Sequence, residues 1–255
     1  MLFTLLGEFV LPGEGSAWTS AVLAAFERLG VAEKATRQAL MRASNAGWLS
    51  AEKAGRRTRW LLTPAATAML TDGARRIYSF GPTQTWDGQW VLVQARIPEA
   101  DRRARHVVRT RLAWAGFGTL GPGLWISPHV AREQEAVRVL RDAGVAADAH
   151  VFVAKRTGLS EPRDMVAAAW DLSEVEAAYE RFIAGFRAPA VPPDVLLRQL
   201  ELVHAWRRFP ALDPALPREL LPPHWVGLKA AELFADRHQR WMDDACREWK
   251  RLNSD

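Results

Sequence analysis

The sequence has little cysteine and no long apolar run. Cys246 is the only cysteine in 255 residues, so the chain can form neither an internal disulfide nor a cysteine-cluster metal site. No apolar stretch approaches the ~18–20 residues that span a bilayer. Residues 1–10 are apolar but short for a signal peptide, have no basic start and contain Glu8. We therefore expect a cytoplasmic protein that has no membrane partner.

The sequence motifs of common enzyme classes are also missing. The chain contains no glycine-rich phosphate loop, no His-x-x-x-His pair and no nucleophile elbow. Its six histidines are scattered, with no two at metal-ligand spacing on one expected element. We therefore expect no catalytic residue, no metal ligand and no cofactor. His238 lies on the apolar stripe of the last expected helix, where a hydrogen-bonded core residue is a better interpretation than a ligand.

Positive charge is unevenly distributed along the chain. The composition, 49% hydrophobic and 25% charged, is that of a folded protein, and twelve tryptophans provide large aromatic anchors. The net charge is +5, and the excess of Lys and Arg lies in the first 160 residues, whereas the remainder is slightly acidic. A basic N-terminal part favours a polyanionic partner, although chance asymmetry is an alternative.

Residues 1–80 show the pattern of a winged helix-turn-helix. Apolar residues recur at helical spacing in three segments, and two short alternating strands then follow around Gly55. Thr63-Pro64 suits the start of another helix, since proline is favoured in the first turn. The expected elements are helices near 2–9, 20–29 and 32–45, strands at 48–52 and 57–62, and a helix from 64.

The third expected helix has a polar and basic outward face. Its expected inward stripe is Ala35, Ala39, Leu40 and Ala43. Arginine can bridge guanine O6 and N7 and glutamine can pair with adenine, so the outward face could read base edges, while the basic turn grips phosphate. A merely solvated helix face is the alternative. The expected DNA contacts are Lys34, Thr36, Arg37, Gln38 and Arg42 in the helix and Arg56, Arg57 and Arg59 in the turn.

Residues 90–160, which follow a polar linker at 81–89, alternate in the order βαββαβ. This order is the ferredoxin-like pattern. Its first helix is expected near 99–115, and the residues available to face inward are Val107, Val108, Leu112 and Trp114. The arginines of this helix form either an anion site, for a phosphorylated effector or the DNA backbone, or a solvated basic face. They are Arg102, Arg103, Arg105, Arg109 and Arg111.

Residues 170–255 are expected to be all helical. The last helix, near 226–252, carries an apolar seam at heptad-like spacing that serves either as the core of this domain, which we favour, or as a dimer contact. The seam residues are Leu228, Ala231, Ala235, His238, Met242, Ala245, Trp249 and Leu252. The whole chain is thus expected to be an α+β protein with domains at 1–80, 90–160 and 170–255.

Several motifs in order resemble the PaaX family of transcriptional repressors. They are LLGEFVLPGEG near the start, WTSAVLAAFERLGVAEKATRQALMRASNAGWLSAEKAGRRTRWLLT, ARRIYSF, WDGQWVLVQARIPE and RLAWAGFGTLGPGLWISPH. The resemblance is dense over about 1–130. It implies a winged helix, a middle domain similar to the small nuclease subunit of CRISPR adaptation, and a helical C-terminal domain. It also places Arg37, Arg42 and the Gly55-Arg56-Arg57 turn on the DNA-binding segment.

The resemblance implies a regulator of aromatic-compound catabolism of the phenylacetate type. Such proteins are homodimers that bind double-stranded operator DNA and are released by an aryl-acyl-CoA effector such as phenylacetyl-CoA. No motif identifies the residues of the effector pocket. Two alternative functions are a metal-dependent nuclease in the middle domain and a protein-interaction module. The nuclease relative has an acidic metal ligand at the end of its first strand, where this chain reads Gln94-Ala95-Arg96-Ile97, so we expect no nuclease activity.

Overall fold

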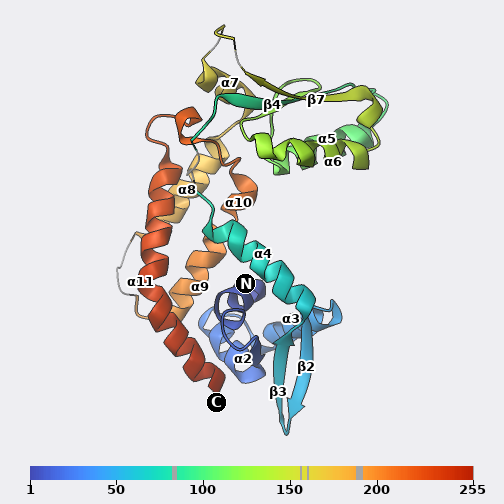
Figure 1. The fold of residues 1–255 in the computed structure, drawn as a ribbon. Coiled ribbons are helices and arrows are strands. Elements are labelled where there is room, and N and C mark those ends of the chain that lie inside the picture. Colours follow the sequence, from blue (N-terminus) through green and yellow to red (C-terminus); the bar gives the residue numbers. More distant parts are fainter. Residues whose placement is uncertain (82–84, 156, 160, 188–191, 255) are drawn as a thin grey trace. The chain divides into compact units, whose positions relative to one another are not determined.

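The computed structural model describes residues 1–81, 85–155, 157–159, 161–187 and 192–254 (Figure 1). Helices and strands group into two compact units. The first unit comprises Met1–Ser79, Arg181–Arg208 and Ala230–Asp255, and the second comprises Phe80–Glu180 and Phe209–Lys229. Two helices, α8 (Ser173–Phe186) and α11 (Val226–Ser254), contribute residues to both units.

The first unit contains the helices and strands expected near its N-terminus. Its elements are α1 (Leu2–Leu5), the π-helical turn η1 (Leu6–Val10), β1 (Ser16–Trp18), α2 (Thr19–Arg28), α3 (Glu33–Asn45), β2 (Leu49–Ala54), β3 (Arg57–Leu62), α4 (Pro64–Tyr78) and α9 (Val195–Trp206). The start of α4 is confirmed: the Thr63 side chain accepts a hydrogen bond from the Ala66 amide at 3.2 Å, and Pro64 occupies the first turn.

The first unit also contains a three-stranded antiparallel sheet of order β1-β3-β2. In Figure 1 the β2–β3 hairpin extends beyond α3 as a two-stranded ribbon. Its turn requires a left-handed backbone, which Gly55 supplies with φ of 62°. The sequence pattern did not predict β1, because three residues are too few to show an alternation.

The core of the first unit joins segments that are far apart in sequence. Leu5, Leu6 and Phe9 of the first helical segment are buried together with Leu200 of α9 and Trp249 of α11. The rings of Phe9 and Trp249 stack with their centroids 6.0 Å apart. The N-terminal helices therefore share one apolar core with helices from the last third of the chain.

Glu8 is a buried carboxylate in this same unit. Only 2% of Glu8 is exposed, and its oxygens accept hydrogen bonds from the Tyr78 hydroxyl, from Gln199 Nε2 at 2.7 Å and from His238 Nε2 at 2.8 Å. Burial, with the nearby Glu8 carboxylate, raises the pKa of Tyr78 above its ordinary value, so the hydroxyl stays a donor. His238 is thus a hydrogen-bonded core residue, as the sequence predicted.

The second unit contains a four-stranded antiparallel sheet of order β5-β6-β4-β7. Its elements are β4 (Gln89–Ala95), α5 (Arg102–Trp114), β5 (Gly118–Gly121), β6 (Leu124–Ser127), η2 (Val130–Arg132), α6 (Glu133–Asp142), η3 (Ala146–Asp148), β7 (Ala149–Lys155), α7 (Pro162–Ala169), α10 (Phe209–Leu212) and η4 (Arg218–Leu220). From β4 to β7 these elements follow the strand and helix order that the sequence predicted.

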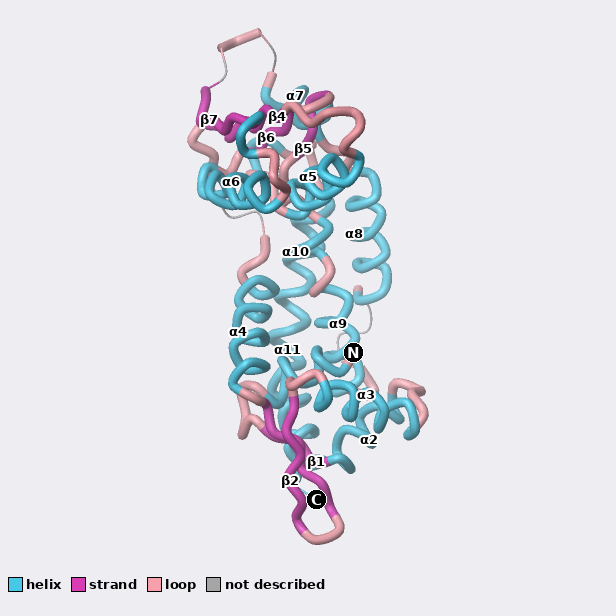
Figure 2. The backbone as a smooth tube through the Cα atoms, turned by 90° about the vertical axis from the view of Figure 1, so that its right-hand side faces the viewer, coloured by secondary structure: helices cyan, strands magenta, loops and turns pink. Residues whose placement is uncertain are grey.

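Helices α5 and α6 cover one face of this sheet (Figure 2). Val91 and Val93 of β4 are buried on that face with Val108 and Leu112 of α5 and Leu140 of α6. Beside β5, the Trp170 ring lies so close to Gly118 that a Cβ there would be 2.5 Å from it. Only glycine fits at this position without moving the ring.

The predicted burial of two residues, Trp114 and Ala235, is wrong. Trp114 is 77% exposed, because the buried stripe of α5 runs through Ala104, Val108 and Leu112 and Trp114 falls off that stripe. Ala235 is exposed because its neighbour Phe234 takes the buried position. In α11 the described buried apolar residues are Ala230, Phe234, Trp241, Ala245 and Trp249.

Candidate nucleic-acid interface

Helix α3 presents a polar and basic face to solvent. Lys34, Arg37, Gln38 and Arg42 are exposed and line an open hollow of about 740 Å³, together with Met41. Counted from Lys34, the other four residues follow after three, four, seven and eight positions, which places all of them on one side of the helix. Arginine, lysine and glutamine on a single exposed helix face are able to reach base edges in a major groove.

Thr36 is the exception among the expected DNA contacts. The sequence predicted that it faces outward, but the structure buries it. The residue is 1% exposed, and its hydroxyl donates a hydrogen bond to the Ala32 carbonyl oxygen at 3.4 Å. Ala35, expected inside, is exposed instead. Leu40 and Ala43 are buried as expected, so the inward stripe differs from the expected one mainly at its N-terminal end, where Thr36 takes the place of Ala35.

Arg37 has an internal partner on the exposed face. Its Nε lies 2.7 Å from Glu33 Oε1, one turn earlier, and both side chains are more than half exposed. An exposed pair of this kind contributes roughly 0.3–0.5 kcal/mol. Such a pair holds the guanidinium along the helix and is easily exchanged for a base or a phosphate.

The β2–β3 hairpin carries the second group of arginines. Arg56 and Arg57 are exposed at the turn, and the Arg57 guanidinium lies 4.6 Å from the centroid of the Trp18 ring. Arg59 is less available. Its guanidinium lies 5.7 Å from the same ring, and its Nη2 donates to Glu14 Oε2 at 2.5 Å. The hairpin thus offers phosphate contacts mainly from Arg56 and Arg57.

Trp18 is a residue of this surface that the sequence did not single out. It lies opposite Arg59 in the pairing of β1 with β3, and its ring face holds both hairpin arginines by cation–π contacts. The only signal in the sequence is an aromatic residue just before α2. That signal becomes informative only when the pairing of the three-residue β1 is known.

Clusters of metal ligands and membrane-spanning helices are both absent from the described residues. Among them, no three His, Cys, Asp or Glu side chains gather closely enough to hold a metal ion. Within the same residues, no helix has the length and apolarity needed to cross a membrane.

Comparison with known proteins identifies the family. Models of three parts of one family match the chain: "PaaX-like protein" at residues 1–66, "PaaX protein central Cas2-like domain" at 83–166 and "PaaX-like protein C-terminal domain" at 170–251. The transcriptional repressor PaaX of Escherichia coli (strain K12) is 34% identical over 254 residues, which cover 94% of this chain and 79% of that protein. The chain belongs to the PaaX family of transcriptional repressors.

A solved structure is similar over nearly the whole chain. The uncharacterized protein Rv0674 from Mycobacterium tuberculosis has a TM-score of 0.65 and 25% sequence identity, and the match covers 94% of this chain and 95% of that one. The first PaaX match includes α3 and the β2–β3 hairpin, and the Cas2-like match includes the four-stranded sheet. The curated PaaX relative is a regulator and not an enzyme, and membership of its family places this chain in the same class.

Proposed function

We propose that this PaaX-family protein is a DNA-binding repressor of a phenylacetate-type aromatic catabolic operon. Lys34, Arg37, Gln38 and Arg42 of α3 contact base edges in the major groove, and the hairpin arginines contact phosphates or the minor groove. The observation that carries this proposal is the single exposed basic face of α3 beside a basic hairpin. The printed function of the E. coli relative supports it.

This function implies a particular domain layout. In it, residues 1–80 act as a winged helix-turn-helix, residues 90–160 as a ferredoxin-like middle domain and residues 170–255 as a helical domain. The element order β4-α5-β5-β6-α6-β7 and the strand order β5-β6-β4-β7 support the ferredoxin-like description. The limits of the three family matches support the division into three.

The repressor acts as a homodimer on double-stranded operator DNA, and an aryl-acyl-CoA such as phenylacetyl-CoA releases it. Release requires that the effector bind the DNA-free state more tightly than the DNA-bound state. The coupling is of order 1–3 kcal/mol, as in other allosteric regulators.

A gel-shift titration tests the proposal. The probes are duplexes from upstream of the protein's own gene and neighbouring genes, with and without a panel of aryl-CoA thioesters. We expect a retarded complex on one of them, lost when one thioester is added. Affinity should fall steeply with salt because several phosphate contacts release counterions. A flat salt dependence would contradict the DNA-binding role and favour the protein-interaction alternative.

A further inference from the structure

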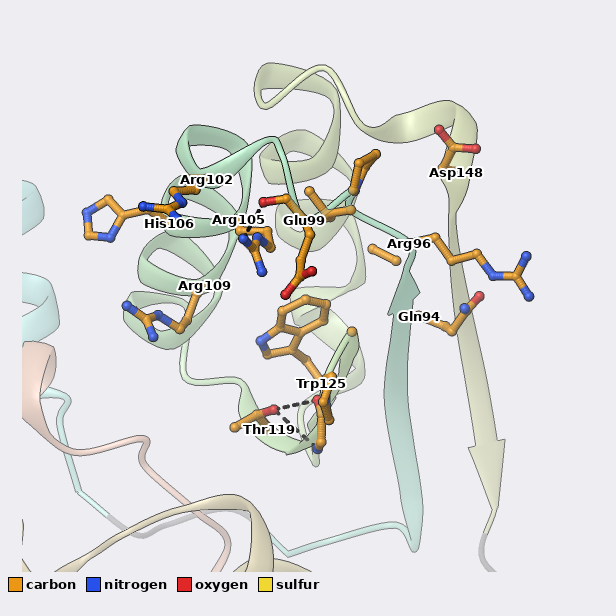
Figure 3. Close-up of a pocket in the computed structure, with 16 residues that line it drawn as sticks. Gln94, Arg96, Glu99, Arg102, Arg105, His106, Arg109, Thr119, Trp125 and Asp148 are labelled. Atoms are coloured by element: carbon orange, nitrogen blue, oxygen red, sulfur yellow. Dashed lines mark hydrogen bonds between the residues drawn. The ribbon is translucent and has the colours of Figure 1, made fainter.

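An open pocket of about 1150 Å³ in the second unit has four arginines and a histidine among its lining residues (Figure 3). It lies where β4 ends, beside α5 and the turn between β5 and β6. Its basic residues are Arg96, Arg102, Arg105, His106 and Arg109, and its acidic residues are Glu99 and Asp148. None of these residues has a place in the proposed DNA interface.

The arginines of this pocket lack carboxylate partners. Among the described residues, Arg96, Arg102, Arg105 and Arg109 form no ion pair. By contrast, Arg111 of the same helix, outside the pocket, pairs with Asp142 at 2.9 Å. Four arginines against two carboxylates therefore leave the described lining of the pocket with an excess of positive charge.

The position of these charges in α5 is electrostatically unfavourable. Arg102 and Arg105 lie at the N-terminal end of α5, where the helix dipole favours anions. The carboxylate of the N-cap Asp101 offsets part of this cost, but the first turn itself contains no acidic residue. Arg102, Arg105 and Arg109 also follow one another at spacings of three and four residues, at which like charges repel. A bound anion would offset both costs.

Arg105 has an unused donor. Its Nη2 donates to the Glu99 carbonyl oxygen at 2.5 Å, while its Nε is buried and has no hydrogen-bond partner among the described residues. Figure 3 shows the Glu99 side chain between the Arg105 guanidinium and the Trp125 ring. An anion in the pocket could accept hydrogen bonds from the Arg105 guanidinium, which forms no ion pair among the described residues, and a planar ring could lie against Trp125.

A second, mostly apolar pocket of about 750 Å³ shares one lining residue, Thr119, with the first. Val166, Ala169, Leu172 and Leu220 provide apolar walls. Trp170 also lines it, and its indole N–H is buried without a hydrogen-bond partner among the described residues. This space suits an apolar group attached to a polar link that can accept a hydrogen bond.

We infer that the pocket with the arginines binds the phosphate groups and base of a nucleotide-type ligand, and that the second pocket, which shares Thr119 with it, takes an apolar group joined to that ligand. The phosphates contact Arg102, Arg105 and Arg109, and the base lies against Trp125. That this ligand is the effector rests on the proposed function, whereas the anion site depends on the pocket alone.

Calorimetric titration of the full-length protein tests the site without DNA. The probes are coenzyme A, phenylacetyl-CoA, inorganic phosphate and adenosine. We expect both CoA compounds to bind, phenylacetyl-CoA more tightly, and adenosine more weakly than either. Arg102→Gln and Arg109→Gln, both at exposed positions, should each weaken coenzyme A binding about tenfold, the loss expected when a charge-assisted hydrogen bond is removed.

Arg103→Gln is the matched control, because it removes the same charge from the same helix outside the pocket. Its affinity for coenzyme A should equal that of the wild type. Glu99→Gln should tighten binding, since it removes a negative charge from the pocket lining. The proposed site would be wrong if the Arg102 and Arg109 variants bound coenzyme A as tightly as the control does. It would also be wrong if the wild-type protein did not bind coenzyme A at millimolar concentration.

Gel shifts with the same variants separate this site from the proposed function. If phenylacetyl-CoA releases the operator from Arg102→Gln and Arg109→Gln at wild-type concentrations, the site is wrong while the effector function holds. If calorimetry maps phenylacetyl-CoA to the pocket but the operator complex persists, the site holds and the effector function is wrong. If the variants instead lose operator affinity in the absence of any CoA compound, the pocket is a DNA-backbone site and the inference fails.

Discussion

Arg37 is the residue of α3 on which sequence recognition is expected to depend most. In Arg37→Ala the Glu33 pair is lost at little cost, so the change in operator binding reports the base contact. We expect a loss of about 1–3 kcal/mol and a weaker preference at one base pair. Fluorescence anisotropy with the operator and its single-base variants measures both effects.

Arg240→Ala is the control for Arg37→Ala. Arg240 is also exposed and also pairs with a carboxylate four residues away, Asp236, at 2.7 Å, but it lies on α11. The Arg240→Ala variant should bind the operator with the same affinity as the wild-type protein. Equal losses in the two variants would show that the effect comes from net charge rather than from a base contact.

Arg57 is expected to act differently, because a hairpin arginine that stacks on Trp18 is suited to phosphate rather than to a base edge. Arg57→Ala should weaken all duplexes to a similar degree and reduce the slope of log K against log salt by about 1. Titrations of operator and unrelated DNA at several salt concentrations measure this. A loss confined to the operator, with an unchanged slope, would assign Arg57 to base readout instead.

At the level of elements, the sequence predicted the bounds of α3 to within one residue and the burial of Leu40 and Ala43, but not the burial of Thr36. Alanine is apolar and threonine polar, so Ala35 was expected inside and Thr36 outside. The packed side of the helix is set by Leu40 and Ala43, which Thr36 joins at a spacing of four, and its hydroxyl is satisfied by the Ala32 carbonyl. A local bond of this kind lets a small polar residue be buried, and no periodicity of the sequence reveals it.

In the second unit, η2 holds the loop that follows α10. His129 Nε2 donates to the Ala215 carbonyl oxygen at 2.8 Å, and Arg132 donates to the Pro214 carbonyl oxygen at 3.2 Å. Burial, with the neighbouring Arg132 charge, lowers the pKa of His129 from 6.5 to about 4. The imidazole is therefore neutral in the folded protein at neutral pH.

The lowered pKa of His129 predicts an acid-dependent loss of stability. The unfolded chain takes up the proton near pH 6.5 and the folded protein only near pH 4. The contribution of His129 is thus fully present above pH 6.5 and is lost as pH falls toward 4. The loss reaches at most about 3 kcal/mol, less for the partial exposure of the ring. Urea unfolding at pH 7.5 and 4.5 should show a smaller difference for His129→Gln than for wild type, and identical differences would contradict the prediction.

For the whole molecule, the sequence predicted the family, most helices and strands, and the basic surfaces. It did not predict that the N-terminal helices share their core with α9 and α11. That arrangement depends on contacts such as Glu8 with Gln199 and His238, which no local pattern encodes. Heptad spacing located Ala245 and Trp249 on the buried stripe of α11, but it could not identify the partner of that stripe.

Trp249 provides the test of this shared core. It is 4% exposed and stacks on Phe9, so Trp249→Ala should leave a cavity and lower the free energy of unfolding by about 3–5 kcal/mol. Trp114→Ala, at a site 77% exposed, should change it by no more than about 0.5 kcal/mol. Urea unfolding measures both changes in the free energy of unfolding. The operator affinity of the Trp249 variant should fall only under conditions in which part of this variant is unfolded. Wild-type stability of Trp249→Ala would mean that residues 1–80 fold as an independent domain, because their core would then not depend on α11.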